Sequence, residues 1–374
     1  MSRPSPIARI LRDPVASTES RESSALLTGA GTFVLGTLVG LVVFWGHGVP
    51  ISGRGSIGNF VAIGGALAAI AAFLLGCVLR RAQQRSDPSG GASLPRPHWF
   101  DVAALTLAHA AIAMLGWIGL ASVVSKSFVG ATVYSTSAAL LAGVALAVTA
   151  YLAFLSAVNL TPMLLSLVLA LFLTVGALTS MLSASDPSWW KENLSALGIS
   201  DDLSAMAFNL TLVIAGVMVT TIAHYATLSL PCSTRPEARS KRLVRLALVL
   251  IGVLLGCVGA FPADEFLGVH NTSATGMVIV YIALVVSLRR LLPSAPRIFV
   301  LLGYVYVGVI VLLAVFLVTG YYNLTAVELV AAVLIFSWII VFLRNTEAVT
   351  TSRPESAPPR RPGPPTRTRP TATS

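Results

Sequence analysis

The stretch IFVLLGYVYVGVIVLLAVFLVTG, residues 298–320, carries no charged side chain over its 23 residues. An α-helix rises about 1.5 Å per residue, so a helix of this length crosses the hydrocarbon core of a bilayer, which is about 30 Å thick. The backbone N–H and C=O groups of such a segment find partners in lipid only when the segment is helical. The stretch therefore predicts a transmembrane helix, and much of the chain repeats its character.

Nine further apolar runs of similar length lie along the chain. Of its 374 residues, 55% are hydrophobic and 11% are charged, whereas soluble domains carry roughly 25% charged residues. This composition excludes a soluble globular protein and predicts an all-α, polytopic integral membrane helical bundle of about ten transmembrane helices. The expected spans are Ala25–Trp45, Ile57–Leu79, Val102–Val124, Thr136–Val158, Met163–Leu182, Ala205–Leu228, Leu243–Phe261, Asn271–Leu288, Ile298–Gly320 and Ala326–Leu343.

The basic residues predict the orientation of the bundle. Loops rich in Lys and Arg are retained in the cytoplasm. With the N-terminus inside, 22 of the 25 Lys and Arg residues fall in cytoplasmic segments, and the exceptions are Arg54, Lys126 and Lys191. A missed or extra span would break this bias, so the pattern supports ten spans with both termini in the cytoplasm. The excess of arginine over lysine is typical of a high-GC genome, and we expect a multi-pass protein of a bacterial plasma membrane.

Several classes of function are excluded by what the sequence lacks. The net charge of +10 does not indicate nucleic-acid binding, because the basic residues lie between apolar runs. The chain has no P-loop, H-E-x-x-H, C-x-x-C or G-x-S-x-G motif. Cys77, Cys232 and Cys257 have no paired spacing, so we expect no disulfide and no cysteine metal site. No cofactor is indicated.

Polar side chains are scarce at membrane depth. His109 is the one ionisable residue near the centre of an expected span. No carboxylate shares its depth, so the pattern favours a helix-to-helix hydrogen bond over a proton relay.

Polar residues collect instead in two loops that the orientation places outside. Together these loops hold six carboxylates and one lysine, and the polarity continues into the helices that follow them. Polar groups that enter a bilayer normally face the bundle interior or a wet cavity. We therefore predict an outward-facing polar vestibule, with candidate lining residues Asn209, Asp264, Glu265, His270, Asn271 and Ser273.

Each of these features also has a structural explanation. Trp189 and Trp190 are interfacial anchors at the outer headgroups, or else a platform for a lipid or sugar. Asp201 or Asp202 can cap the sixth span, and Asp264 can cap a short interfacial helix.

The chemistry of the second loop stays open as well. Asp264 and His270, with Glu265, are candidate metal ligands, although no spacing rule supports them. The same groups could form an acid/base pair. Ser273, one turn after His270, makes a hydrolase conceivable.

Short motifs in the second half of the chain resemble a known family. They are Asn193-Leu-Ser-Ala-Leu-Gly198, Phe208-Asn209, Gly259-Ala-Phe-Pro262, His270-Asn271 and Ala274. In this order and at these topological places they resemble the bacterial membrane family catalogued as domain of unknown function 998 (DUF998), itself similar to the Frag/DRAM/Sfk group. The resemblance covers six spans, from about residue 163 to residue 343. It implies an architecture and marks Gly198, Asn209, Pro262 and His270, but it implies no reaction.

The resemblance, together with composition, predicts four parts. Residues 1–24 form a cytoplasmic tail, 25–158 a four-helix membrane region, 163–343 the six-helix region that resembles the family, and 344–374 a disordered Pro/Arg-rich cytoplasmic tail. From Thr351 on, the chain has seven prolines and five arginines and too few apolar residues to build a core.

These observations favour a multi-pass membrane protein that binds or handles lipids through its vestibule. Membrane lipids are the expected partners, and nucleic acid is not. A secondary transporter built from five plus five spans is the alternative, followed by a metal-assisted membrane hydrolase. The scarcity of buried charge favours a non-enzymatic protein over an enzyme.

The distribution of basic residues makes a direct prediction about topology. Reporter fusions after Arg85, Arg239, Pro293 and Arg361 should report the cytoplasm, and fusions after Lys126, Glu192 and Asp264 the exterior. Inverted signals at both Glu192 and Arg239 would show that the number of spans before the sixth is wrong.

Overall fold

The computed structural model describes residues 14–86, 98–199, 202–228, 230 and 234–351. In this part of the chain, ten helices are long and apolar enough to cross a membrane, which confirms the predicted all-α bundle. They are α2 (Thr18–Val43), α3 (Ile57–Ser86), α4 (Trp99–Ser127), α5 (Ser135–Val158), α6 (Pro162–Ser183), α7 (Leu203–Leu228), α8 (Arg235–Ala260), α9 (Leu267–Leu291), α10 (Arg297–Val318) and α11 (Leu324–Thr351).

Most helices extend beyond the apolar runs, because hydropathy does not detect polar helix ends. The α2 helix begins at Thr18 instead of Ala25, where the Ser17 side chain accepts a hydrogen bond from the Ser20 N–H. The α8 helix begins at Arg235 because Thr234 and Glu237 form a capping box there. Such caps satisfy free N–H groups and so fix the first turn of a helix.

The expected eighth span, which starts at Asn271 in the sequence, is part of a longer helix. The α9 helix begins at Leu267, so His270 and Asn271 lie in its first two turns. The α11 helix continues to Thr351, past residue 344, where the predicted disordered tail begins. The rest of that tail, the segment 87–97, Cys232 and Asp201 lie outside the described residues.

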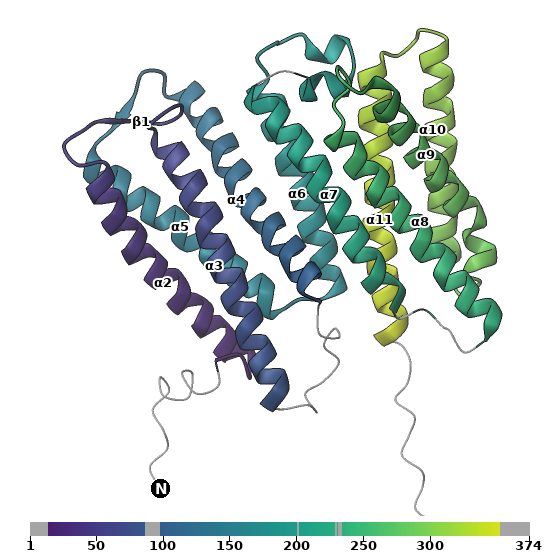
Figure 1. Cartoon of the computed structure of the whole chain (residues 1–374), viewed down its shortest axis with the longest axis horizontal. Helices are drawn as coiled ribbons and strands as arrows, with labels where there is room; N and C mark the ends of the chain where they lie inside the picture. The colour runs from purple at the N-terminus through teal and green to yellow at the C-terminus, as the bar shows by residue number, and fades with distance from the viewer. Residues whose placement is uncertain (1–13, 87–97, 200–201, 229, 231–233, 352–374) are drawn as a thin grey trace, which may run out of the picture.

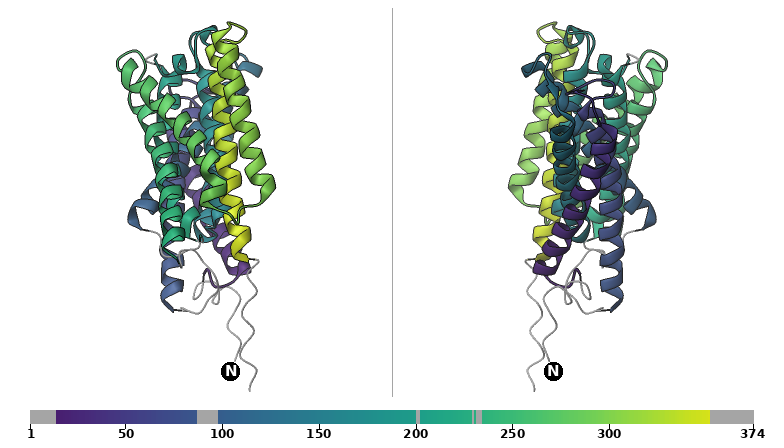
Figure 2. Two further views of the ribbon diagram at one scale, coloured as in Figure 1. Left: turned by 90° about the vertical axis from the view of Figure 1, so that its right-hand side faces the viewer. Right: turned by 90° about the vertical axis from the view of Figure 1, so that its left-hand side faces the viewer.

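The helices form two groups that stand side by side (Figure 1). In the first group, α5 packs against both α2 and α3, and α3 packs against α4. In the second, each helix from α6 to α11 contacts its neighbour in sequence, and α11 returns to contact α6. The α4 helix joins the groups through contacts with α6 and α7. Seen from either side, at 90° to the view of Figure 1, the bundle is much narrower (Figure 2).

The start of α2 and the end of α11 lie at the same end of the bundle (Figure 1). At the opposite end, which we call the outer end after the predicted orientation, the α2–α3 and α4–α5 connections meet. Strands β1 (Val49–Pro50) and β2 (Thr132–Val133) pair there in antiparallel register. The loop between α6 and α7 lies at the same end.

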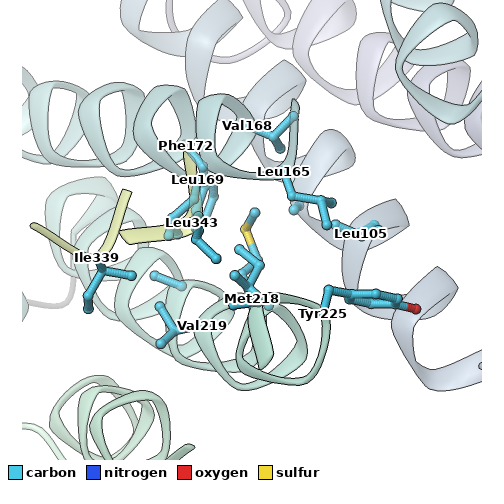
Figure 3. Packing of buried hydrophobic residues seen from close by; sticks show 14 of the residues in the cluster. Leu105, Leu165, Val168, Leu169, Phe172, Met218, Val219, Tyr225, Ile339 and Leu343 are labelled. Atoms are coloured by element: carbon cyan, nitrogen blue, oxygen red, sulfur yellow. The ribbon is translucent and has the colours of Figure 1, made fainter. Parts of the chain in front are cut away.

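The core of the second group consists of interlocking apolar side chains from α6, α7 and α11, with α4 at its edge. Figure 3 shows Phe172, Leu169, Met218 and Ile339 in this contact; all are buried. The opposite faces of the helices carry exposed Leu, Ile and Val. In a bilayer such faces contact lipid tails at no cost. The side chains inside the bundle and those on its lipid-facing surface are therefore both apolar.

Glycines allow α7 and α8 to approach closely. A Cβ atom on Gly252 of α8 would lie 2.7 Å from the Gly216 carbonyl oxygen, and one on Gly216 would lie 2.5 Å from the Gly252 carbonyl oxygen. Small residues that bring two helix backbones together are a main source of helix association in membranes. Gly252 thus serves the packing of α8 against α7 of the same chain.

Hydrogen bonds link polar side chains of different spans. His109 of α4 bonds the Ser156 hydroxyl of α5 through Nε2 at 2.8 Å, and its Nδ1 bonds the Leu105 carbonyl at 2.7 Å. Asp101 of α4 accepts a hydrogen bond from the Tyr225 hydroxyl of α7 at 2.5 Å. The first of these is the predicted helix-to-helix hydrogen bond, and the second ties the two groups together.

The glycine contact predicts a specific loss of stability. Gly252→Ala must separate α7 from α8, because backbone atoms block the new methyl group; overpacking of this kind costs about 1–3 kcal/mol. We expect a lower melting temperature in detergent. Gly308→Ala in α10 is the control, because nothing lies within 4 Å of its Cβ position. A Gly308→Ala loss as large as that of Gly252→Ala would contradict this account.

Candidate functional site

The segment between α6 and α7 forms a structured loop at the outer end, which we call the outer loop (residues 184–199 and 202). It contains two short 3-10 helices, η1 (Trp189–Lys191) and η2 (Leu194–Gly198). Its ends are fixed by carboxylates: Asp186 accepts from the Ser188 N–H, and Asp202 accepts from Ser185 through its N–H and hydroxyl. Asp202 also accepts from the Ala205 N–H at 3.0 Å, so it caps α7 as predicted.

Polar contacts attach the outer loop to α11. The Leu194 N–H donates to Glu328 Oε2 at 2.6 Å, and Asn323 Nδ2 donates to the Trp190 carbonyl at 2.7 Å. The Lys191 ammonium lies 5.7 Å from the centre of the Trp190 ring, and Trp190 is 51% exposed. The two 3-10 helices are therefore held against the start of the last helix, where Figure 1 shows the loop.

A close contact between Gly198 and Asn209 attaches the loop to α7. Asn209 Nδ2 donates to the Gly198 carbonyl at 2.9 Å. A Cβ atom on Gly198 would lie only 2.6 Å from Asn209 Oδ1 and 2.9 Å from Phe208 Cδ1. Only a glycine leaves room for this contact, which links two positions that the sequence marked separately.

His270 attaches the loop to α8 and α9. Its Nδ1 lies 2.9 Å from the Phe261 carbonyl oxygen, and its Nε2 lies 2.9 Å from Ser195 Oγ. A carbonyl oxygen only accepts, so Nδ1 carries a proton, and in the neutral imidazole Nε2 is then the acceptor for the Ser195 hydroxyl. His270 is 4% exposed, whereas Ser195 is partly exposed. The serine therefore lies between the buried imidazole and the surface.

A polar cavity of about 610 Å³ opens beside η2. Asn209, Asp264 and Glu265, which were predicted from the sequence, line it together with Asp202. No lysine or arginine is among its lining residues, and its apolar wall includes Ile199, Leu203, Ala205, Met206 and Pro262. The cavity combines negative charge with apolar surface.

The remaining predicted residues lie elsewhere. His270 and Ser273 are buried in α9, Asn271 is exposed on the same helix, and none of the three lines the cavity. Within the described residues, no three His, Cys, Asp or Glu side chains form a group that could hold a metal ion. Both ring nitrogens of His270 are engaged in hydrogen bonds inside the chain.

Sequence reasoning missed two residues of this site, Ser195 and Glu328. Ser195 is the partner of His270, a role that Ser273 does not take. Glu328 is the only carboxylate in the last apolar run, which is a signal that could have marked it. Its partner Leu194 is 134 positions away in the chain, so the pairing itself needed a structure.

Comparison with known proteins places this site inside a family. The family model described as "Protein of unknown function (DUF998)" matches residues 166–345, nearly half of the chain and almost all of α6–α11. The matched region includes the outer loop, the cavity and the Ser195–His270 pair. No curated protein and no solved structure matches the chain.

The Gly198–Asn209 contact predicts non-additive mutations. Gly198→Ala introduces a methyl group against the Asn209 amide, and Asn209→Ala removes a hydrogen bond worth about 1 kcal/mol. In the double variant the amide no longer meets the methyl group. The combined loss of unfolding free energy should therefore fall below the sum of the single losses by about 0.5–3 kcal/mol, measured by denaturation in detergent. Strict additivity would show that the two residues do not interact.

Proposed function

Through residues 166–345 the chain belongs to the DUF998 family of unknown function, and from its outer cavity we propose that it binds the polar headgroup of a membrane lipid. The observation that carries the proposal is the composition of that cavity. Asp202, Asp264 and Glu265 line it with no basic side chain among them.

The charge of the cavity selects the headgroup. Several carboxylates in one concave site favour a cation and disfavour an anion. Asp202 is already engaged by Ser185 and Ala205, whereas Asp264 and Glu265 are exposed. These two carboxylates are therefore the ones available to a ligand, and an ammonium group of a zwitterionic lipid is the chemistry that suits them.

The apolar wall and the position of the cavity support a lipid over a free solute. Leu203 and Met206 lie in the first turn of α7, where the span ends, and both line the cavity. Trp189 and Trp190 on the same loop are of the type that anchors at headgroup level. A ligand with an ammonium head and an apolar body would contact both kinds of surface.

The other two functions have less support. A transporter usually leaves ionisable groups at the midplane, whereas His109 is bonded to Ser156 and the one buried, unpaired ionisable hydroxyl in the described spans is that of Tyr281. A metal-assisted hydrolase needs a ligand set that the described residues do not supply. We further propose that the outer end faces the exterior of a bacterial plasma membrane, on the basis of the basic residues in the opposite loops.

Headgroup binding can be tested with purified protein in nanodiscs or detergent. Added phosphatidylethanolamine should raise the melting temperature or appear as bound lipid in native mass spectrometry, and phosphatidylglycerol should not. Asp264→Asn combined with Glu265→Gln should weaken phosphatidylethanolamine binding by roughly tenfold, since exposed charge pairs contribute up to about 1 kcal/mol each.

The control is Glu192→Gln, which removes an exposed carboxylate from the outer loop outside the cavity. It should leave lipid binding unchanged. Equal binding of the anionic lipid, or unchanged binding by the Asp264 and Glu265 double variant, would overturn the proposal.

A further inference from the structure

We propose that Ser195 and His270 form a nucleophile and general base that cleave an acyl ester at the outer surface of the membrane. This proposal rests on the hydrogen bonds of the two residues and does not depend on headgroup binding in the acidic cavity.

The hydrogen-bond directions are those that an activated serine needs. Ser195 Oγ lies 2.9 Å from His270 Nε2, and the Nδ1–H group donates to the Phe261 carbonyl at 2.9 Å. The carbonyl therefore holds the imidazole in the tautomer whose Nε2 can accept the serine proton. A nucleophile bonded to a base, with that base oriented by a third group, is the general signature of nucleophilic catalysis by serine.

A carboxyl group positions the segment that carries the serine. Glu328 Oε2 accepts from the Leu194 N–H at 2.6 Å, and Leu194 is the residue before Ser195. Glu328 therefore fixes η2, and with it Ser195, against the start of α11.

Two residues near the Leu194–Glu328 hydrogen bond in sequence have buried polar atoms without a partner among the described residues. Asn193 Oδ1 and Thr325 Oγ1 are buried and have no hydrogen-bond partner in the described part of the chain. Asn193 precedes Leu194, and Thr325 lies one turn before Glu328 on α11. Buried polar groups are normally paired, so Asn193 Oδ1, two residues before Ser195, is an acceptor left for a polar group from outside the chain.

A second serine–histidine pair in the molecule provides a contrast. His109 and Ser156 make the same pattern of hydrogen bonds between α4 and α5. His109 of that pair lies inside α4, and Ser156, close to the end of α5, is buried. Ser195 instead is partly exposed and lies in a loop at the end of the spans. The first pair is placed to join two helices, and the second is placed to meet a substrate.

The position of Ser195 indicates the class of substrate. The outer loop follows the end of the α6 span, and its tryptophans are typical of the level where ester groups of lipids meet water, so we place it at that level. A carboxylic ester with an acyl chain in the outer leaflet would reach this level without leaving the membrane. We assign the site to acyl esters of membrane lipids, with water as the acyl acceptor.

The reaction balances with groups on the protein. Ser195 Oγ attacks the ester carbonyl carbon while His270 Nε2 takes the hydroxyl proton. The bond between the carbonyl carbon and the alcohol oxygen breaks, and Nε2 returns the proton to the departing alcohol. Water then attacks the acyl–Ser195 ester, gives one proton to Nε2, and a carboxylic acid leaves as Oγ regains that proton. The sum is ester plus water giving acid plus alcohol.

A long-chain alkyl fluorophosphonate tests the nucleophile in the intact protein. It phosphonylates activated serines and not ordinary ones, and the adduct is located by mass spectrometry of peptides. We expect a single adduct on Ser195, its loss in Ser195→Ala, and its retention in Ser188→Ala, a matched change in the same loop. His270→Asn should slow labelling by at least about 100-fold, the contribution expected of a general base.

Each outcome decides the proposal. If Ser195 of the unaltered protein stays unlabelled, or if Ser188 and Ser156 react as fast as Ser195, the pair is a structural link only. If His270→Asn folds, judged by its melting temperature, and labels at the unaltered rate, the base assignment is wrong. If that variant does not fold, the selectivity for Ser195 over Ser188 in the unaltered protein decides alone. Labelling that persists in the Asp264 and Glu265 double variant would separate this site from headgroup binding.

Discussion

Hydrocarbon supplies no hydrogen-bond partner to a backbone group, and this constraint underlies the whole structure. It requires each span to be a helix, and it leaves the contacts between spans to small residues and paired polar groups. The approach of α7 and α8 at Gly216 and Gly252 is of the first kind. The bonds of His109 to Ser156 and of Tyr225 to Asp101 are of the second. Chemistry that needs water as a reactant is therefore expected at the ends of the bundle, where water is near.

The outer loop follows the same constraint at the membrane surface. Its short 3-10 helices cannot satisfy their own ends, and side chains from α7, α9 and α11 supply the missing partners. Asn209, His270 and Glu328 each bond a different part of this loop. One loop is thus fixed by the helix that follows it, α7, and by two helices that are distant in the sequence, α9 and α11. This makes Ser195 a serine on a rigid support, which precise chemistry requires.

The sequence predicted the bundle well because its spans depend on a local property. The apolar runs mark ten helices, but caps such as Ser17 and Thr234 set the true helix starts. The candidate site was predicted in part: Asn209, Asp264 and Glu265 do line one cavity. The pairing of His270 with Ser195 could not be read from the sequence, since the two residues are 75 positions apart. From the sequence alone, Ser273 was the candidate partner, because it lies one turn after His270 in the same helix.

The short helix η2 also connects the two proposed activities. Gly198, at its end, lines the acidic cavity and bonds Asn209, and Ser195 lies three residues earlier on the same turn-forming segment. A ligand that fills the cavity therefore contacts the element that carries the nucleophile, without touching the nucleophile itself. Because η2 is held at both ends, by Glu328 through Leu194 and by Asn209 through Gly198, it can shift only if one of these bonds changes. The proposed headgroup site beside Gly198 and the proposed nucleophile Ser195 therefore lie on the same short helix. This proximity is the physical basis for a protein that recognises one part of a lipid and acts on another.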